Sequence, residues 1–594
     1  MSYRRKKLLA LFCATALSMT AVAGCTGTKS STGNVVSSET ETNAEETSAQ
    51  SEAGTFSSAD MFTERDLAGT YEESGAVYVT LSDDGITGET DGVVIKGQTV
   101  TITAEGTYIF SGTLSEGQIV VDADNAKVQI VFDNVDITCA SSAAVYVKSA
   151  EKVFVTLAEG SQNTLRNTDE YVAIDDNNID AVIFAKSDLT LNGTGSLTII
   201  SAEGHGIVSK DDLKITGDTY DITAAGHALS GKDSVRIADG TFILTAEKDG
   251  IHAENADDEE KGYIYIADGD FTITSDGDGM DASNIVQIED GTLDITAGGG
   301  AANSLKTHES DVPGGPGGGM PQNGEKLDGE SMPQMGEKPD GENMPQDTTT
   351  DESGTSTKGI KAGGGMYLNG GTYQIDSADD SIHSNANITI ADGTYTLATG
   401  DDGVHADDAL IVNGGTITVT ESYEGLEGLT VTINDGTIDI TASDDGINTA
   451  GEKMELNGGY IHILAGGDGV DSNGDLTING GEIYIDGPSD NGNSAIDYGD
   501  RSSAYVNGGT LVAIGSSGMA EGMSDSSKQK VLMVKLGEQM EAGNVVLTDS
   551  EGNVIVSYTA LKTYDCVIIS TAEVESGATY TLTTSGTTTE VTAE

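Results

Sequence analysis

The sequence contains no tryptophan, and aromatic residues make up only 5% of its 594 residues. This scarcity argues against a binding surface built from a platform of stacked rings. Basic residues are also few: there are 29 Lys and Arg against 97 Asp and Glu, so 97 − 29 leaves a net charge of −68. A nucleic-acid binder needs a basic surface to release counterions, so this class is excluded. The same deficit excludes attachment to an anionic membrane through basic residues.

The chain has only four cysteines, and two of them lie in the N-terminal targeting segment. Basic residues at positions 4–7 precede an apolar run over 8–22, which is shorter than the ~20 residues that span a bilayer and indicates a secretory signal. The run ends in Val-Ala-Gly-Cys at 22–25, which resembles the lipobox of bacterial lipoproteins. We therefore expect residues 1–24 to be a lipoprotein signal peptide and Cys25 to carry the lipid. The protein would then sit on the extracellular face of the cell membrane. An ordinary signal cleaved near Ala23 is the alternative.

Residues 25–58 are rich in Ser, Thr, Glu and Gly and almost lack large apolar groups, so we expect a disordered tether. The two remaining cysteines, Cys139 and Cys566, are far apart in the sequence. In the elongated fold predicted below they lie at opposite ends, so we expect two separate buried thiols rather than a disulfide.

Glycine, in contrast, is abundant at 78 residues, and many glycines recur in a short strand-and-turn pattern. The turn glycines are Gly240, Gly269, Gly291, Gly371, Gly393, Gly415, Gly436, Gly459, Gly481 and Gly509. Most of them are 21 to 23 residues apart. This period is too short for a βαβ unit and fits one coil of a β-solenoid.

Large apolar residues lie two positions after each turn glycine, as Phe242 follows Gly240 and Tyr373 follows Gly371. A second apolar series includes Ile251, and its neighbours alternate outward. Stacked coils would place these side chains ~4.8 Å apart as internal ladders. The sequence predicts an all-β fold, a right-handed parallel β-helix of about 22 residues per coil. The handedness follows that of parallel crossover connections.

The period also sets the expected domain organisation. One spacing of 80 residues, between Gly291 and Gly371, implies a coil that carries an insertion at about 298–358. Its Pro, Gly, Met and acidic repeats cannot form a core, so we expect a disordered flap. We expect an N-terminal β cap over 59–121, the parallel β-helix over 122–517 and a small C-terminal β module over 518–594.

Several segments resemble a known family. They are Gly-Thr-Tyr-Ile-Phe-Ser-Gly-Thr-Leu at 106–114, the stretches 122–134 and 143–147, and the Asp-Gly-Ile-His-Ala coils beginning at 249–253. Together they are similar to the polysaccharide-lyase-like, carbohydrate-binding parallel β-helix proteins first recognised in clostridia, over roughly residues 76–592. The resemblance implies a calcium-carrying right-handed β-helix that binds cellulose and acidic sugars such as polygalacturonate, without established catalysis. The insertion interrupts the family's pattern.

Each coil also presents two columns of polar residues around its second apolar series. The first column contains Asp249, Asp278, Asp380, Asp402, Glu424, Asp445 and Asp468. The second contains His252, Asp281, His383, His405, Glu427, Asn448 and Asp471. Neighbouring coils bring these groups within ~5 Å of one another, where several oxygens can share a calcium ion.

The candidate calcium ligands are Asp278, Asp281, Asp380, Asp402, Asp445, Asn448, Asp468 and Asp471. Asp445, Asn448, Asp468 and Asp471 form the sharpest set. The alternative is that Asp-Gly merely provides good turn chemistry. We interpret His383, His405 and Glu427 as carbohydrate-binding residues. A transition-metal site at the histidines has weak support, since His383 and His405 are its only pair on neighbouring coils.

Three functions remain open. The first is calcium-dependent binding of acidic plant-type polysaccharide such as pectin, with cellulose as a further ligand, by a monomer whose only membrane contact is its lipid anchor. The second is a calcium-dependent polysaccharide lyase, with Lys361 or Arg501 as the base that removes the proton beside the uronate carboxyl. The third is a structural adhesin or stalk. Enzymatic activity is the less favoured expectation, and no other catalytic residues are predicted.

Overall fold

The computed structural model describes residues 55–593 apart from 89, 173, 307–355 and 500. Almost every element in these residues is a strand, which confirms the all-β prediction. The described helical elements are α1 (Ser58–Met61), α2 (Glu64–Leu67) and the short η1 (Ala301–Asn303), and none of them is long and apolar enough to cross a membrane. The signal peptide, Cys25 and most of the tether lie outside the described residues.

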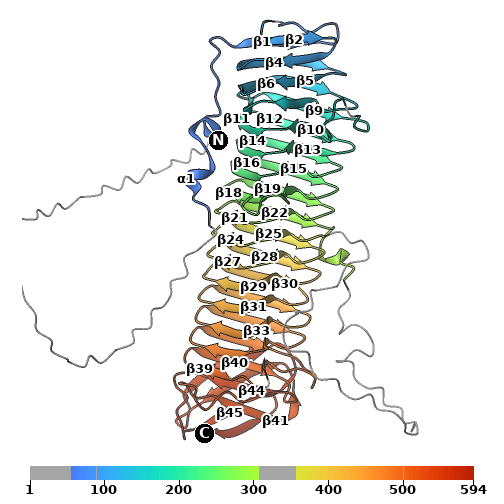
Figure 1. Cartoon of the computed structure of the whole chain (residues 1–594). Helices are drawn as coiled ribbons and strands as arrows, with labels where there is room; N and C mark the ends of the chain where they lie inside the picture. The colour runs from blue at the N-terminus through green and yellow to red at the C-terminus, as the bar shows by residue number, and fades with distance from the viewer. Residues whose placement is uncertain (1–54, 89, 173, 307–355, 500, 594) are drawn as a thin grey trace, which may run out of the picture. The chain divides into compact units, whose positions relative to one another are not determined.

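Successive coils stack through parallel strand pairing, and each coil contributes to three ladders (Figure 1). The first ladder is β9 (Gln162–Asn167), β12 (Ser196–Ser201), β14 (Asp212–Ala224), β16 (Ser234–Ala246), β19 (Asp270–Ser275), β22 (Thr292–Ala297), β25 (Thr372–Ser377), β28 (Thr394–Thr399), β30 (Thr416–Glu421), β32 (Thr437–Ala442), β34 (Tyr460–Ala465), β37 (Glu482–Asp486) and β40 (Thr510–Gly515).

The second ladder carries the polar columns. It consists of β7 (Val145–Ser149), β10 (Ala181–Ala185), β13 (His205–Ser209), β15 (Leu229–Gly231), β17 (Ile251–Ala253), β20 (Met280–Ala282), β23 (Ile360–Ala362), β26 (Ile382–Ser384), β29 (Val404–Val412), β31 (Leu426–Ile433), β33 (Ile447–Leu456), β35 (Val470–Ser472) and β38 (Ile496–Tyr498).

The third ladder shares the long strands β14, β16, β29, β31 and β33 with the other two. Its own strands are β8 (Lys152–Leu157), β11 (Asp188–Gly193), β18 (Tyr263–Ile266), β21 (Val286–Ile288), β24 (Met366–Leu368), β27 (Ile388–Ile390), β36 (Asp475–Ile478) and β39 (Ala504–Val506).

The core is built from the predicted apolar series in the predicted register. Phe242 pairs with Phe271 and their rings stack at 4.7 Å, while Tyr373 pairs with Tyr395 at 4.5 Å. These side chains are at most 2% exposed. Like groups lie on like groups because the strands keep one pairing register and the longer coils place their extra residues in loops, so each apolar position meets its counterpart one coil away.

The insertion lies inside a single coil, as the 80-residue spacing predicted. The strands on either side of it stay in register, since Met280 pairs with Ile360 and Leu293 pairs with Tyr373. Residues 298–306 and 356–359 are described and lie against the coils, whereas the predicted disorder concerns residues that are not described.

The chain ends differ in part from expectation. Parallel pairing already begins between β1 (Val77–Leu81) and β4 (Gly106–Leu114), within the residues expected to form a cap, and continues to β6 (Lys127–Thr138). In the same region β2 (Val93–Lys96) and β3 (Thr99–Ile102) form an antiparallel hairpin, and β3 continues in parallel to β5 (Gln118–Asp122). Phe56, expected in the tether, stacks on Tyr263 at 4.3 Å, because an aromatic side chain gains free energy by covering apolar surface.

At the C-terminal end antiparallel strands follow the last coil. β44 (Tyr564–Ser570) pairs with β40 and with β41 (Leu532–Met540). β42 (Gly543–Thr548), β43 (Val554–Ala560), β45 (Thr579–Thr583) and β46 (Thr588–Thr592) form a separate four-stranded antiparallel sheet. Cys139 and Cys566 are both buried free thiols, as predicted.

Candidate functional site

The two polar columns run side by side along the second ladder, and we call them together the acidic ridge. Second-column residues pair rung by rung in the predicted order, and Lys361 fills the rung between Asp281 and His383. Backbone hydrogen bonds hold the first column in the same order, and they place Lys358 between Asp278 and Asp380. The shared strand register therefore aligns the polar groups as it aligns the core.

First-column carboxylates accept hydrogen bonds from the backbone of the next coil. Oδ1 of Asp249 accepts the N–H of Asp278 (3.0 Å), and Oδ1 of Asp445 accepts the N–H of Asp468 (2.6 Å). These bonds join neighbouring coils rather than closing a turn, so one carboxylate oxygen already has a structural partner and Oδ2 is left for another. The columns were expected to face solvent, but Asp278 and Asp380 are only 1% exposed because neighbouring coils cover them.

In the middle of the ridge, lysine ammonium groups contact the carboxylates. We call Lys306, Lys358, Asp379, Asp380 and Asp401 the lysine stretch. Lys358 Nζ lies 2.8 Å from Asp379 Oδ1 and 2.6 Å from Asp380 Oδ2. Lys306 Nζ lies 2.7 Å from the same Asp379 oxygen and also contacts Asp401. Burial alone would raise the pKa of Asp380, yet the neighbouring cations hold it well below its usual value.

Lys361, the base of the lyase alternative, also neutralises the ridge. Its Nζ lies 3.4 Å from Asp278 Oδ2 and 3.3 Å from Asp281 Oδ1. Burial lowers the pKa of Lys361, but these two aspartates outweigh it and raise the pKa overall. A lysine with a raised pKa stays protonated and is a poor base. Arg501 is exposed in the turn between β38 and β39.

The predicted carbohydrate-binding residues lie on three successive rungs, since His383 pairs with His405 and His405 with Glu427. His383 is only 9% exposed, and its Nε2 lies 2.9 Å from Asn385 Oδ1. His405 Nδ1 lies 3.3 Å from Asp402 Oδ2 and 3.4 Å from Glu427 Oε2. In this part of the ridge, histidine nitrogens lie against the carboxylates, since His383 Nδ1 also lies 2.9 Å from Asp380 Oδ2.

Asp445, Asp468 and Asp471 differ from the rest, and we call them the carboxylate triad. One oxygen of each lies within 4.8 Å of the others. Burial, followed by neighbouring carboxylates, raises the pKa of Asp445 to about 8, of Asp468 to about 7 and of Asp471 to about 6. In the described part of the chain, no Lys, Arg or His nitrogen pairs with them. The triad thus concentrates negative charge without an internal cation.

Asn448 adds a further oxygen beside the triad. It lies on the rung between Glu427 and Asp471. Its Nδ2 donates to Glu424 Oε2 (2.9 Å), while its Oδ1 is buried and accepts no hydrogen bond from the residues described. The four residues of the sharpest predicted set are therefore neighbours, and one offers an unused acceptor.

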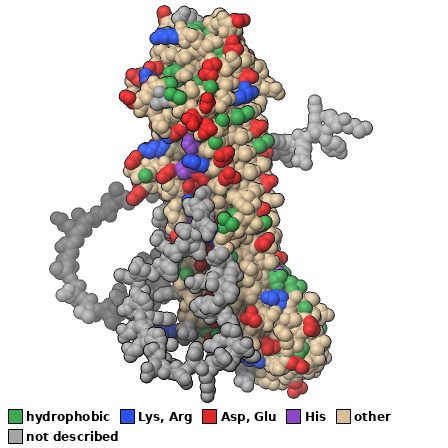
Figure 2. All heavy atoms as spheres, turned by 90° about the vertical axis from the view of Figure 1, so that its right-hand side faces the viewer, with side chains coloured by type: hydrophobic (Ala, Val, Ile, Leu, Met, Phe, Trp, Pro, Cys, Tyr) green, Lys and Arg blue, Asp and Glu red, His purple; other side chains and the backbone are tan. Residues whose placement is uncertain are grey.

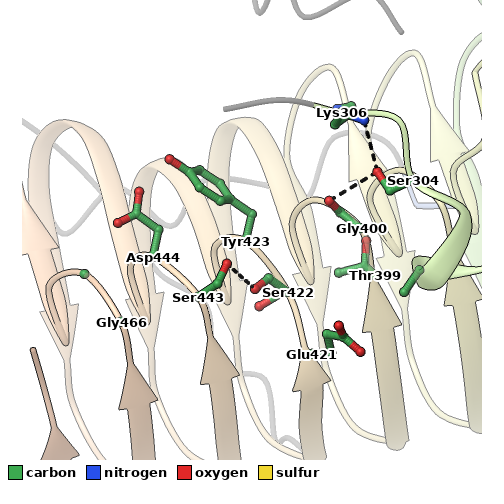
Figure 3. A pocket seen from close by; sticks show the side chains of 12 residues that line it. Ser304, Lys306, Thr399, Gly400, Glu421, Ser422, Tyr423, Ser443, Asp444 and Gly466 are labelled. Carbon is green, nitrogen blue, oxygen red and sulfur yellow. Dashed lines mark hydrogen bonds between the residues drawn. The ribbon is translucent and has the colours of Figure 1, made fainter. Parts of the chain in front are cut away.

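A groove of about 470 Å³ adjoins the ridge (Figure 3). It is lined by Ala301, Ser304, Lys306, Thr399, Gly400, Glu421, Ser422, Tyr423, Ser443, Asp444, Gly466 and Gly467. Figure 3 shows the residues before Lys306 forming one wall and successive coils forming the floor. Asp444 joins the groove to the triad, because it directly precedes Asp445 and its charge helps to raise the pKa of Asp445 and Asp471.

Sequence reasoning missed several of these residues. Lys358 was recognisable, since Lys-Gly-Ile-Lys at 358–361 repeats the spacing of Asp-Gly-Ile-His at 249–252. Lys306 and Tyr423 carried no such signal, because their positions depend on how the insertion returns to the coils and on which turns border the groove.

Comparison with known proteins places the chain in a family. The family model described as "carbohydrate-binding domain-containing protein" matches residues 96–403 and 401–551. The chain belongs to this family. A carbohydrate-binding domain-containing protein of Acetivibrio thermocellus is 42% identical over 130 residues, which are 21% of this chain and 46% of the relative. The chain thus spans about half the length of that curated relative.

Among solved structures, the chain is similar to the polysaccharide lyase-like protein from C. thermocellum, determined as a gadolinium derivative. The identity is 36%, with a TM-score of 0.37, and the match covers 38% of this chain and 92% of that one.

Proposed function

We propose that this carbohydrate-binding domain-containing chain binds acidic polysaccharide through calcium held at the carboxylate triad. The observation that carries the proposal is three clustered carboxylates that pair with no cation of the described residues, next to a groove across several coils. A divalent ion would relieve the repulsion that raises their pKa values.

Calcium also explains how so acidic a protein attracts an acidic sugar. With a net charge of −68, the protein repels uronate unless a cation lies between the carboxylates. Calcium takes six to eight oxygens at ~2.3–2.6 Å. Asp445, Asp468, Asp471 and Asn448 supply part of this set, and sugar carboxylate and water complete it.

The groove offers the remaining contacts of a glycan site. Four coils contribute to it, and at ~4.8 Å per coil their three spacings extend about 14 Å, enough for a short oligosaccharide. Ser422 and Ser443 provide hydroxyl groups, and the half-buried Tyr423 ring provides an amphipathic surface. The site thus combines charge recognition with polar contacts.

The wider proposal has three further parts. The stacked coils form a right-handed parallel β-helix, Cys25 carries a lipid that holds the protein on the extracellular face of the membrane, and the chain is a monomer. Cellulose is a further ligand. In the lyase alternative the base is Lys361 or Arg501, and the raised pKa of Lys361 argues against that role.

Retention on polygalacturonate tests the proposal directly. We expect binding in calcium, loss in chelator, and weak binding by the Asp468→Asn/Asp471→Asn variant in either condition. The Asp435→Asn/Asp439→Asn variant removes the same charge from exposed positions and serves as the matched control. Unchanged retention in chelator would overturn the calcium bridge and favour a neutral-glycan binder or an adhesin. Unsaturated product would favour the lyase.

A further inference from the structure

The ridge contains a second cluster of ligand atoms, nearer the N-terminus and made from different donors. His205 and His227 occupy the first column in the two coils before Asp249, and His252 lies in the second column. The three imidazole rings stack, with centroids 4.8 Å apart for His205 and His227 and 4.1 Å for His227 and His252. Figure 2 shows histidine side chains gathered among acidic and basic ones on this side of the body.

Two of the histidines direct nitrogens at one carboxylate oxygen. His227 Nδ1 and His252 Nδ1 each lie 3.0 Å from Asp249 Oδ2. The N–H of Asp249 donates to His227 Nδ1 (3.2 Å), and in the tautomer that accepts this bond the nitrogen carries a lone pair. His252 Nδ1 is buried and has no hydrogen-bond partner of adequate geometry among the described residues. A lone pair that faces a carboxylate at contact distance calls for a cation between them.

The donor set and spacing select the class of ion. We propose that His227, Asp249 and His252 bind a zinc-class divalent transition-metal ion. Asp281 lies beside the cluster, since its Oδ2 lies 3.5 Å from His252 Nδ1, but it is not among the residues whose ligand atoms all lie within 4.8 Å of one another, so water completes the coordination. Bonds of ~2.0–2.2 Å in a tetrahedron place ligand atoms about 3.3–3.6 Å apart, close to the distances seen. Binding replaces the 3.2 Å hydrogen bond to His227. Calcium, which prefers oxygens, fits poorly.

The other histidine pair on the ridge is less suited to a metal. Asp380, next to His383, already pairs with Lys358, so a lysine charge occupies that position. At the proposed site Lys361 contacts only the other oxygen of Asp281, and Lys248, which precedes Asp249, is exposed. The alternative is that no metal binds and that His252 carries a proton. Protonated His252 would then form an ordinary ion pair with Asp249.

Zinc binding by the wild-type chain is the first test. The metal-free protein is titrated with Zn²⁺ at neutral pH in excess calcium, which occupies the triad. We expect one zinc per chain, and we expect imidazole scattering in the zinc X-ray absorption spectrum. No zinc binding, or a coordination shell without nitrogen, would show that a proton fills the site and would overturn the proposal. This measurement needs no variant.

Variants then locate the site. His252→Phe keeps a stacked ring but removes the ligand, so zinc affinity should fall by about 100-fold or more, beyond the ~10–100-fold effect of losing an outer partner. His205→Phe is the matched control and should bind as wild type, because His205 belongs to the stack but lies outside the ligand cluster. Thermal unfolding of each variant checks the fold.

Equal affinity in His252→Phe and wild type would place zinc elsewhere. The Asp468→Asn/Asp471→Asn variant should keep its zinc, so the inference does not depend on the calcium proposal.

Discussion

Two carboxylate clusters on one ridge have similar spacing but different counterions. In the lysine stretch, one oxygen each of Asp379, Asp380 and Asp401 lies within 4.8 Å of the others, as in the carboxylate triad. Lys306 and Lys358, one on each side of the insertion, pair with the first cluster, while no Lys, Arg or His among the described residues pairs with the second. The comparison teaches that a repeated sequence motif brings carboxylates together at several places along the acidic ridge. Whether a lysine lies beside a cluster then decides whether that cluster needs a cation from solution.

The largest expected effect comes from removing a lysine. Lys358→Met leaves Asp380, which is 1% exposed, without its ammonium partner. Breaking a buried pair in this way costs about 3–5 kcal/mol of unfolding free energy, measured by chemical denaturation. Lys453→Met is the control, since Lys453 pairs with Glu455 at the surface and should contribute under about 1 kcal/mol. Equal losses would mean that the comparison between the two clusters is wrong.

Calcium should stabilise the protein through the triad. The gain is RT ln(1 + [Ca]/Kd), about 2.7 kcal/mol at a hundredfold excess over Kd. Differential scanning calorimetry with and without calcium should show this gain in wild type and in Asp435→Asn/Asp439→Asn. In Asp468→Asn/Asp471→Asn the gain should be much smaller. An undiminished gain there would place calcium elsewhere.

The triad also predicts how stability depends on pH in chelator. The folded pKa values of Asp445, Asp468 and Asp471 are raised to about 8, 7 and 6, above the ~3.9 of an unfolded aspartate. Their contribution is therefore fully present below about pH 4 and is lost as the pH rises through 6 to 8. Melting temperature should fall over this range in chelator, and calcium should reduce the fall. A flat profile would contradict the raised pKa values.

The smallest effect is expected from shortening the insertion. Replacing residues 310–350 by a short Gly/Ser linker retains Lys306 and Lys358, so the unfolding free energy should change by under about 1 kcal/mol. Extending the deletion through Lys306 should cause a larger loss, because Asp379 and Asp401 lose an ammonium partner. Comparison of the two deletions by denaturation separates the lysine from the rest of the insertion.

The sequence predicted the register of the coils well because register depends on local periodicity. The predicted neighbours Phe242 and Phe271, and Asn448 and Asp471, pair as expected, since a spacing repeated along the chain becomes a column when coils stack. The same reasoning found all three members of the carboxylate triad.

By itself, then, the sequence determined the all-β character, the position of the insertion and most members of the two polar columns, though not Lys358, His205 or His227 in the first. Only the tertiary structure decided which carboxylates are neutralised. Lys306 reaches Asp379 from 73 positions away, and His227 faces Asp249 across a coil boundary. The sequence period predicts which residues share a column. Which cation lies next to each carboxylate depends instead on burial, on side-chain length and on the path of the insertion.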